Sequence, residues 1–558
     1  MTDEYQTTSR FRRGLAATGI VGAVVALGLA ACGGEVDNAA APTPAAPTTM
    51  QVQNAASACA ALVGAGVPAS AIALPTQGAT ITSASLVAAD SKTGLPEYCQ
   101  VLGKVLAANA ADPAINFEVN LPTTWNFKAL QLGGGGFNGI LVTGLGGQIG
   151  GVPNWPSGEK QPLSMNYVTF GSDGGTTFDG SFGLNAQALA NYGGESVKRT
   201  HDTALFLINA FYKTAPHRMY HIGGSKGGHE SLVAAQRYAS DYDGIVAYYP
   251  ANQNQAMVMS WFRMWNAAYS TSGGALDPAK QALVRAKVVA ACDGLDGVVD
   301  GIVSNIPACQ ATFSINSLRC SGGADTGDTC LSDAQINTLI TAATPMEFAF
   351  PLANGVTSNG PYPVFQGGDM EGTLFDPLGT DGTHTGYFGL ANAVITYFDL
   401  QNPNATSVGF DYRAWQSRVT QLSTELDATN PNLDAFQKKG GKLILVQGTT
   451  DMLVTPNQTT AYFNKVAARY GDSITSFVRY YVAPGFGHGN GAFALQWDSL
   501  AALDGWVASG QAPIGPVVTD GNSSTAGRTR PLCEYPQFPK YKGTGDANIA
   551  SSFVCADS

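Results

Sequence analysis

Residues 219–238 read MYHIGGSKGGHESLVAAQRY and contain the pattern G-x-S-x-G. Met219 to Ile222 predict a short strand, and about Gly228 to Tyr238 predict a helix. Ser225 lies in the tight turn between them. Such a turn projects a serine hydroxyl outward, and glycines two residues on either side avoid steric conflict with neighbouring elements. The alternative is a plain glycine-rich turn, because the chain contains 67 glycines.

Strand and helix patterns alternate on both sides of this turn. Strands that alternate with helices form mostly parallel sheets, so the pattern predicts an α/β fold. The alternation breaks down between about Pro250 and Lys439 and then resumes, which predicts an α/β-hydrolase sheet with a large inserted lid domain. The expected strands cover residues 115–121, 129–132, 167–170, 219–222, 244–249, 443–446 and 476–482, and the expected helices cover 200–212, 228–238 and 459–470.

A nucleophilic serine in this fold needs an acidic residue and then a histidine, each in a loop after a later strand. Asp451 follows the strand at 443–446, and His488 follows the strand at 476–482. The alternatives are an ordinary turn aspartate and an exposed loop histidine. The other five histidines lack this placement: His201, His217, His221, His229 and His384.

The residue types assign roles to this candidate triad. We expect His488 to take the proton of Ser225 and to pass it to the leaving alcohol, while Asp451 holds the imidazole in one tautomer and stabilises its cation. The cluster Gly133–Gly136 would supply one backbone N–H to the developing oxyanion. The residue after the nucleophile, Lys226, would supply the other.

Length and composition limit the function classes. At 558 residues the chain is long enough for a large core and an inserted second domain. Charged residues make up 13% and the formal net charge is −11. A chain with this charge would repel nucleic-acid phosphates, so we expect no nucleic-acid partner.

The N-terminus has the pattern of an export signal. Basic residues at 10–13 (RFRR) precede an apolar run, Leu15 to Ala31, which ends at Leu29-Ala30-Ala31-Cys32. Small residues before a cysteine match the bacterial lipoprotein box, in which Cys32 becomes the acylated N-terminus. The alternatives are a non-cleaved membrane anchor and a signal peptide that happens to contain a cysteine. We expect an exported protein that is lipid-anchored at the cell envelope (outer membrane or periplasm), or otherwise secreted.

The predicted organisation has five parts. Residues 33–50 are mostly Ala, Pro and Thr and predict a flexible tether, because they carry too few large apolar groups to order themselves. The parts are the signal peptide (1–32), the tether (33–50), the first part of the hydrolase core (51–250), the lid domain with a calcium loop (251–439) and the second part of the core (440–558).

Eight cysteines remain when Cys32 is set aside. An even number in an exported chain favours disulfides, and no CxxC spacing supports metal binding. The sequence by itself does not fix the pairing, but the cysteines fall into four local pairs: Cys59–Cys99, Cys292–Cys309, Cys320–Cys330 and Cys533–Cys555.

The chain resembles the tannase and feruloyl esterase family from about Cys59 to Cys555. The matching motifs, in order, are LPEYC (95–99), Trp125-Asn126, the glycine cluster ending in Asn138-Gly139, YDGIVA (242–247), TRPLCEYPQ (529–537), YKGTGD (541–546) and FVC (553–555). The resemblance implies exported hydrolases of aromatic-acid esters, with a large lid that forms the acyl pocket. It also implies oxyanion donors at Gly136 and Lys226, and it supports the four disulfide pairs.

Two departures from the family pattern stand out. The family usually joins a cysteine before the nucleophile to one after the histidine, but here Gly224 and Gly489 occupy those positions. The triad is therefore expected to be held by packing alone. In addition, the stretch GLANAVITYF (389–398) lacks the lid arginine with which terephthalate-monoester hydrolases grip a free carboxylate.

A loop with three aspartates predicts a structural calcium site. Asp293, Asp296 and Asp300 lie within CDGLDGVVDGI, residues 292–302. Crowded carboxylates suit a hard cation such as Ca²⁺, although they could also be turn residues that cap helices. The family resemblance adds the backbone carbonyls of Val298 and Ile302 as ligands.

These observations predict a serine carboxylic-ester hydrolase for small-molecule aromatic (phenolic) esters, similar to feruloyl esterases or tannases. One alternative is hydrolysis of terephthalate monoesters or aliphatic esters by the same triad. Another is a catalytically silent surface binding protein.

Overall fold

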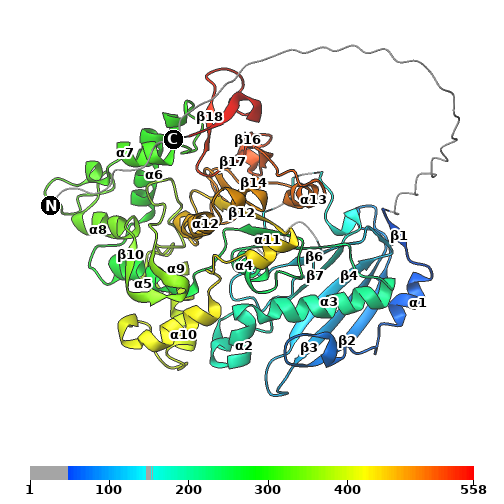
Figure 1. The fold of residues 1–558 in the computed structure, drawn as a ribbon. Coiled ribbons are helices and arrows are strands. Elements are labelled where there is room, and N and C mark those ends of the chain that lie inside the picture. The colour runs from blue at the N-terminus through cyan, green and yellow to red at the C-terminus, as the bar shows by residue number, and fades with distance from the viewer. Residues whose placement is uncertain (1–47, 146–151, 154, 157, 558) are drawn as a thin grey trace, which may run out of the picture. The chain divides into compact units, whose positions relative to one another are not determined.

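The computed structural model describes residues 48–145, 152–153, 155–156 and 158–557. Its main element is a ten-stranded sheet in the order β17-β13-β12-β9-β8-β6-β7-β4-β3-β2 (Figure 1). The central strands are parallel: β6 (Lys128–Leu132), β7 (Val168–Ser172), β8 (Arg218–Gly224), β9 (Gly244–Tyr248), β12 (Lys442–Gly448) and β13 (Val478–Ala483). The predicted α/β-hydrolase sheet is confirmed.

Both edges of the sheet are antiparallel. At one edge β17 (Cys533–Glu534) pairs with β13. At the other, β2 (Thr76–Val87), β3 (Tyr98–Ala107) and β4 (Ile115–Pro122) form a meander beside β7. Of these strands the sequence predicts only β4, because β2 consists largely of small and polar residues without clear alternation.

Helices cover both faces of the sheet, and alternate strand residues divide between two hydrophobic cores. In β9, for example, Ile245 belongs to one core and Val246 to the other. The first core packs α3 (Ser196–Tyr212), α4 (Lys226–Arg237) and α12 (Pro456–Tyr470) on one face. The second packs α13 (Ser499–Ser509) and α5 (Asn254–Tyr269) on the opposite face. This arrangement fixes the carboxyl ends of the parallel strands, where the candidate site lies.

The segment between β9 and β12 is predominantly helical. After α5 it contains α6 (Pro278–Cys292), α7 (Ile306–Thr312), α8 (Asp333–Ala342), α9 (Gly386–Ala393), α10 (Gln416–Leu426) and α11 (Asp434–Lys439), with the hairpin β10–β11 (Met346–Leu352 and Val356–Asn359). A π-helical turn, η8 (Val394–Asp399), continues α9. The segment belongs to the same compact unit as the sheet, Thr48–Ser558, and its role as a separate lid domain stays a prediction.

The remaining strands and helices lie outside the ten-stranded sheet. In the first half of the described chain are β1 (Met50–Gln51), α1 (Ala55–Ala60) and β5 (Thr124–Trp125), with β1 paired to β5, and α2 (Ala186–Ala190), which precedes α3. Near the end of the described chain are β14 (Leu495–Gln496), β15 (Val517–Asp520), β16 (Thr529–Pro531), β18 (Phe538–Tyr541) and β19 (Phe553–Ala556).

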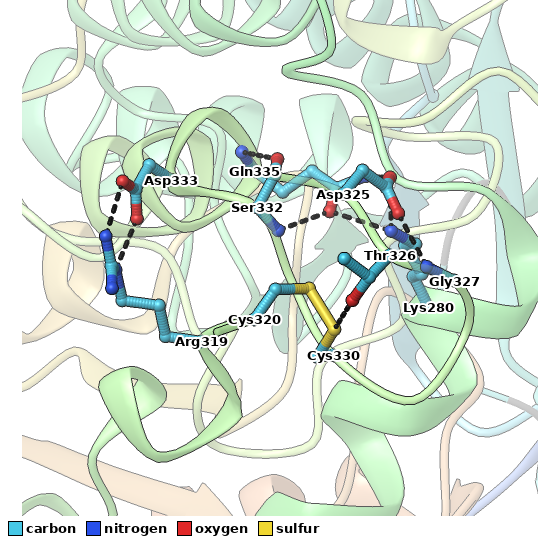
Figure 2. The surroundings of a disulfide bond; sticks show 10 residues. All are labelled: Lys280, Arg319, Cys320, Asp325, Thr326, Gly327, Cys330, Ser332, Asp333 and Gln335. Atoms are coloured by element: carbon cyan, nitrogen blue, oxygen red, sulfur yellow. Dashed lines mark hydrogen bonds and ion pairs between the residues drawn. A yellow bond between two sulfur atoms is a disulfide. The ribbon is translucent and has the colours of Figure 1, made fainter. Parts of the chain in front are cut away.

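All four predicted disulfides are formed. They join Cys59 to Cys99, Cys292 to Cys309, Cys320 to Cys330 and Cys533 to Cys555. Figure 2 shows that ion pairs surround Cys320–Cys330: Lys280 Nζ contacts Asp325 at 2.5 Å, and Arg319 Nε contacts Asp333 at 2.5 Å. The four disulfides restrict the conformations of the unfolded chain, and they support folding in an oxidising compartment.

None of the helices in the described part of the chain is long and apolar enough to cross a bilayer. The predicted signal peptide, its Cys32 and the tether up to residue 47 lie outside the described residues.

Candidate active site

Ser225 lies in the turn between β8 and α4 with a positive φ of 58°. Its carbonyl accepts hydrogen bonds from the backbone N–H groups of His229 and Ala251, each at 3.0 Å. A Cβ on Gly223 would lie 2.2 Å from the carbonyl oxygen of Gly227, and one on Gly227 would lie 2.7 Å from the carbonyl oxygen of Gly134. Only glycine fits at both positions, which is the physical reason for the G-x-S-x-G spacing.

Asp451 and His488 meet at the ends of β12 and β13. His488 Nδ1 lies 2.9 Å from Asp451 Oδ2, and Asp451 is fully buried. The other oxygen, Oδ1, accepts hydrogen bonds from the backbone N–H groups of Leu453 (2.8 Å) and Val454 (2.9 Å). Both oxygens of the carboxylate therefore have hydrogen-bond partners. Its contact with Nδ1 of His488 leaves Nε2 as the ring nitrogen that is not engaged by Asp451.

Ser225 and His488 line the same cavity, which has a volume of about 270 Å³. This size suits one aromatic ring with a short chain, because it is just below the range of about 300–1,000 Å³ typical of drug-sized ligands. The remaining lining is mostly apolar. It comes from Phe137, Met257, Val258, Trp261, Leu390, Val394, Leu453 and Val454.

The predicted oxyanion donors lie on the wall of this cavity. Gly136 has φ +58° and follows β6, and Lys226 is the first residue of α4. Backbone N–H groups in the first turn of a helix have no intrahelical acceptor, so that of Lys226 is available to a ligand. The structure thus brings Ser225, His488, Gly136 and Lys226 to one cavity.

Gly224 and Gly489, at which the family resemblance leads us to expect a cysteine pair, are the chain neighbours of Ser225 and His488. Gly489 has φ +89°, and a Cβ there would lie 3.9 Å from the hydroxyl oxygen of Tyr249. The ring of Tyr249 packs against the His488 imidazole, with ring centroids 4.6 Å apart. An aromatic contact therefore supports the histidine in a chain that has Gly224 and Gly489 in place of the cysteine pair.

His229, one turn after the nucleophile, does not face the cavity. Its Nε2 contacts the carbonyl oxygen of Leu426 at 2.5 Å and its Nδ1 contacts Lys226 Nζ at 2.8 Å. Burial and the nearby Lys226 lower the pKa of His229 well below its ordinary value. The imidazole is a buried structural group, as its position in the sequence predicts.

The aspartate loop is compact. Asp293 accepts hydrogen bonds from the backbone N–H groups of Asp300 and Gly301, and Asp296 Oδ2 is buried with no hydrogen-bond partner. Burial raises the pKa of Asp296 to about 6, and the neighbouring Asp300 and Asp293 add to this effect. Asp300 also pairs with Arg530. Asp293, Asp296 and Asp300 are not among the groups of described residues whose ligand atoms all lie within 4.8 Å of one another, so a cation would have to draw the three carboxylates together and compete with Arg530 for Asp300.

Several cavity residues escape the sequence analysis. Asn254, Met257 and Trp261 lie on α5, and Tyr192 lies in the π-helical turn Asn191–Glu195 before α3. The three α5 side chains reach the cavity only because α5 packs over the carboxyl ends of the strands. By contrast, Leu390 and Val394 belong to the stretch 389–398 that the resemblance places near the acyl pocket. No arginine is among the described residues that line the cavity.

Comparisons with known proteins identify the family and the fold. The model of the family described as "Tannase and feruloyl esterase" matches residues 99–556. An uncharacterized esterase of Agrobacterium fabrum is 37% identical over 90% of this chain and 94% of its own. The mono(2-hydroxyethyl) terephthalate hydrolase of Piscinibacter sakaiensis is 30% identical over 84% and 86%. The crystal structure of feruloyl esterase B from Aspergillus oryzae superposes with a TM-score of 0.72 at 22% identity, covering 90% of this chain and all of that one.

Proposed function

Because the chain belongs to the tannase and feruloyl esterase family and is a carboxylic ester hydrolase, we propose that it is a serine esterase for esters of phenolic acids. One observation carries the proposal. The Asp451–His488 pair, at 2.9 Å, and Ser225 meet at one largely apolar cavity.

The proposed reaction uses the groups at this cavity in two halves. Ser225 Oγ attacks the ester carbonyl carbon as His488 Nε2 accepts its proton, and the carbonyl oxygen becomes an oxyanion beside the N–H groups of Gly136 and Lys226. The C–O bond to the alcohol then breaks, and His488 protonates the leaving oxygen. In the second half His488 takes a proton from water, the resulting hydroxide attacks the acyl carbon, and the bond to Ser225 Oγ breaks as His488 returns the proton to that oxygen and the carboxylic acid leaves. Asp451 stabilises the imidazolium cation in both halves.

The cavity wall supports a neutral aromatic acyl group. Trp261 and Phe137 offer apolar surface to a ring, and Asn254 offers an uncharged amide. Among the described residues that line the cavity, Lys226 is the only lysine or arginine, and its ammonium is turned into the protein, where it donates to the carbonyl oxygen of Tyr192 at 2.6 Å. A free carboxylate on the substrate therefore lacks a partner, which favours feruloyl or galloyl esters over terephthalate monoesters.

Purified protein and its Ser225→Ala variant test this proposal. We expect wild type to hydrolyse methyl ferulate or methyl gallate faster than a terephthalate monoester or a short aliphatic ester, and Ser225→Ala to be inactive on all four. An active Ser225→Ala enzyme would refute the serine mechanism. Preference for the terephthalate monoester would refute the substrate class, and a wild type without esterase activity would favour the silent binding protein.

Export and lipid anchoring are part of the proposal. The four disulfides support folding outside the cytoplasm, and the lipoprotein-box pattern that ends at Cys32 supports an anchor at the cell envelope. Metabolic labelling with palmitate tests the anchor. A Cys32→Ser variant that still incorporates the label would exclude it.

The aspartate loop is proposed to bind one structural Ca²⁺ ion. Its ligands would be the carboxylates of Asp293, Asp296 and Asp300, with the backbone carbonyls of Val298 and Ile302. The gathering of three carboxylates within residues 293–300, with Asp293 and Asp296 buried, is the observation that favours this assignment. The ion would join the two ends of the loop and would take no part in ester cleavage.

A further inference from the structure

A buried carboxylate links the nucleophile helix to the glycine loop. Glu230 lies on α4, one turn after Lys226, and is only 5% exposed. Its Oε2 accepts a hydrogen bond from the backbone N–H of Gly134 at 2.9 Å. Its Oε1 accepts one from Asn138 Nδ2 at 2.7 Å. Both partners belong to the loop that contains Gly136, the proposed oxyanion donor.

The glycine loop lies directly on the first turn of α4. Gly227 N–H donates to the carbonyl oxygen of Gly134 at 3.0 Å, and a Cβ on Gly133 would lie 2.6 Å from Gly227 Cα. Glu230 provides the second attachment of the loop to the helix. With both attachments, the peptides of Gly134 to Gly136 have a fixed position relative to Ser225, since the serine begins the same helix.

The charge of Glu230 is balanced inside the protein. Lys226 Nζ lies 3.6 Å from Glu230 Oε1 and contacts the carbonyl oxygen of Tyr192 and the imidazole of His229. Tyr192 in turn donates through its hydroxyl to the carbonyl oxygen of Gly136 at 3.3 Å. A buried carboxylate without these partners would be strongly unfavourable. Glu230 therefore binds the loop at Gly134 and Asn138, and Tyr192 binds it at the carbonyl oxygen of Gly136.

We propose that Glu230 is a positioning residue for the oxyanion hole: it holds the Gly134 peptide and the Asn138 side chain, and thereby aims the N–H of Gly136 at the oxyanion. The inference rests on the proposed serine mechanism. A donor that is pre-aimed stabilises the transition state more than the bound ester, because negative charge on the oxygen develops only during reaction. Loss of Glu230 therefore affects kcat more than KM.

Two nearly isosteric variants separate hydrogen bonding from packing. Glu230→Met fills the site but accepts no hydrogen bond of comparable strength. Glu230→Gln keeps one amide oxygen for Gly134 N–H, and the Asn138 amide can turn to pair its oxygen, which has no partner in the native site, with the new NH₂ group. We expect kcat to fall by about 10- to 100-fold in Glu230→Met, with KM within about threefold of wild type, and to recover most of this loss in Glu230→Gln.

Rates are normalised to active sites titrated with a phosphonate ester, so that misfolded protein does not contribute. A phenylboronic acid, which forms a tetrahedral adduct with the serine, should lose affinity for Glu230→Met in proportion to kcat/KM, while the affinity for ferulate stays unchanged. Asp202→Leu is the matched control. Asp202 is another buried carboxylate, and it pairs with Lys198, one turn before it on α3. It also accepts a hydrogen bond from the backbone N–H of Ala73 at 2.9 Å. The control should lose stability without losing kcat per site.

The outcomes are distinguishable. A wild-type kcat per active site in Glu230→Met overturns the inference. Equal losses of kcat in Glu230→Met and Glu230→Gln also overturn it. So do equal losses of affinity for the boronic acid and for ferulate in Glu230→Met. Activity in Ser225→Ala would instead overturn the proposed function on which the inference rests. An inactive Ser225→Ala together with a fully active Glu230→Met would leave the serine mechanism intact and remove only the role of Glu230.

Discussion

Asp451→Asn tests how the carboxylate orients the catalytic histidine. In the native chain Oδ1 accepts two backbone hydrogen bonds, and Oδ2 faces His488 Nδ1 at 2.9 Å. An asparagine has one acceptor and one donor group. If its oxygen keeps the backbone bonds, its NH₂ group faces Nδ1, which forces the proton of the imidazole onto Nε2. The nitrogen that should accept the proton of Ser225 is then blocked.

The alternative amide orientation is costly in this site. It would turn the NH₂ group toward the N–H groups of Leu453 and Val454, and two buried donors left unpaired cost about 1–3 kcal/mol each. The blocked tautomer therefore dominates. In the serine-protease template the corresponding substitution lowers kcat by about 10⁴, which at about 1.36 kcal/mol per tenfold corresponds to about 5 kcal/mol. We expect a loss of this order here.

The assay is hydrolysis of methyl ferulate, with the folded fraction measured by near-UV circular dichroism. Asp504→Asn is the control, because Asp504 is a hydrogen-bonded carboxylate on α13 that contacts Lys128 at 2.6 Å and does not line the cavity. It should retain wild-type kcat/KM within about threefold. More than about a tenth of wild-type kcat/KM in folded Asp451→Asn would refute the tautomer argument.

Three further predictions concern the loop, the turn and a buried acid. Removal of calcium by chelation should lower Tm by several degrees and leave kcat at 20 °C unchanged, and an unchanged Tm in calorimetry would contradict the metal site. Gly223→Ala should abolish activity and cost several kcal/mol of stability, because its Cβ would lie 2.2 Å from a backbone oxygen. Gly505→Ala, in open space on α13, should leave activity unchanged and raise the free energy of urea unfolding by about 0.5–1 kcal/mol. The two carboxylate oxygens of Asp399 have no hydrogen-bond partner, and burial raises the pKa of this group to about 8. The folded state therefore binds one more proton than the unfolded state between about pH 4 and pH 8. The free energy of unfolding falls as pH rises through this window. Asp399→Asn should therefore match wild-type Tm near pH 4 and exceed it increasingly toward pH 8, and equal Tm values at both pH values would count against an unpaired buried acid.

The central strands could be predicted because each is a short apolar run between turn residues. Gly244–Tyr248 is buried throughout, and Lys442–Gly448 is buried from Leu443 onward, as parallel strands are. Thr76–Val87 escaped prediction because half-exposed edge strands tolerate small polar residues, so the sequence carries no clear period of two. Its place in the sheet comes from pairing along the whole of Tyr98–Ala107.

The candidate triad could be identified from chain order, but its surroundings could not. A strand-to-helix turn with fixed glycines, and polar residues after later strands, are local features that one sequence reveals. The partners of Glu230 lie 92 and 96 residues away, and the cavity wall comes from α5 and α9. Such contacts depend on how helices pack over the sheet, which local patterns do not encode.

By itself, the sequence determined the alternating α/β pattern and the order of Ser225, Asp451 and His488, and it suggested, without fixing, the local pairing of eight cysteines. Each follows from short-range chemistry: a period of apolar residues, a glycine that admits no side chain, or a short loop between cysteines. Only the tertiary structure decided that Asp451 reaches His488, that Ser225 opens into an apolar cavity, and that a buried carboxylate holds the glycine loop. These depend on the close packing of segments that are distant in the chain, where a shift of about 1 Å makes or breaks a hydrogen bond.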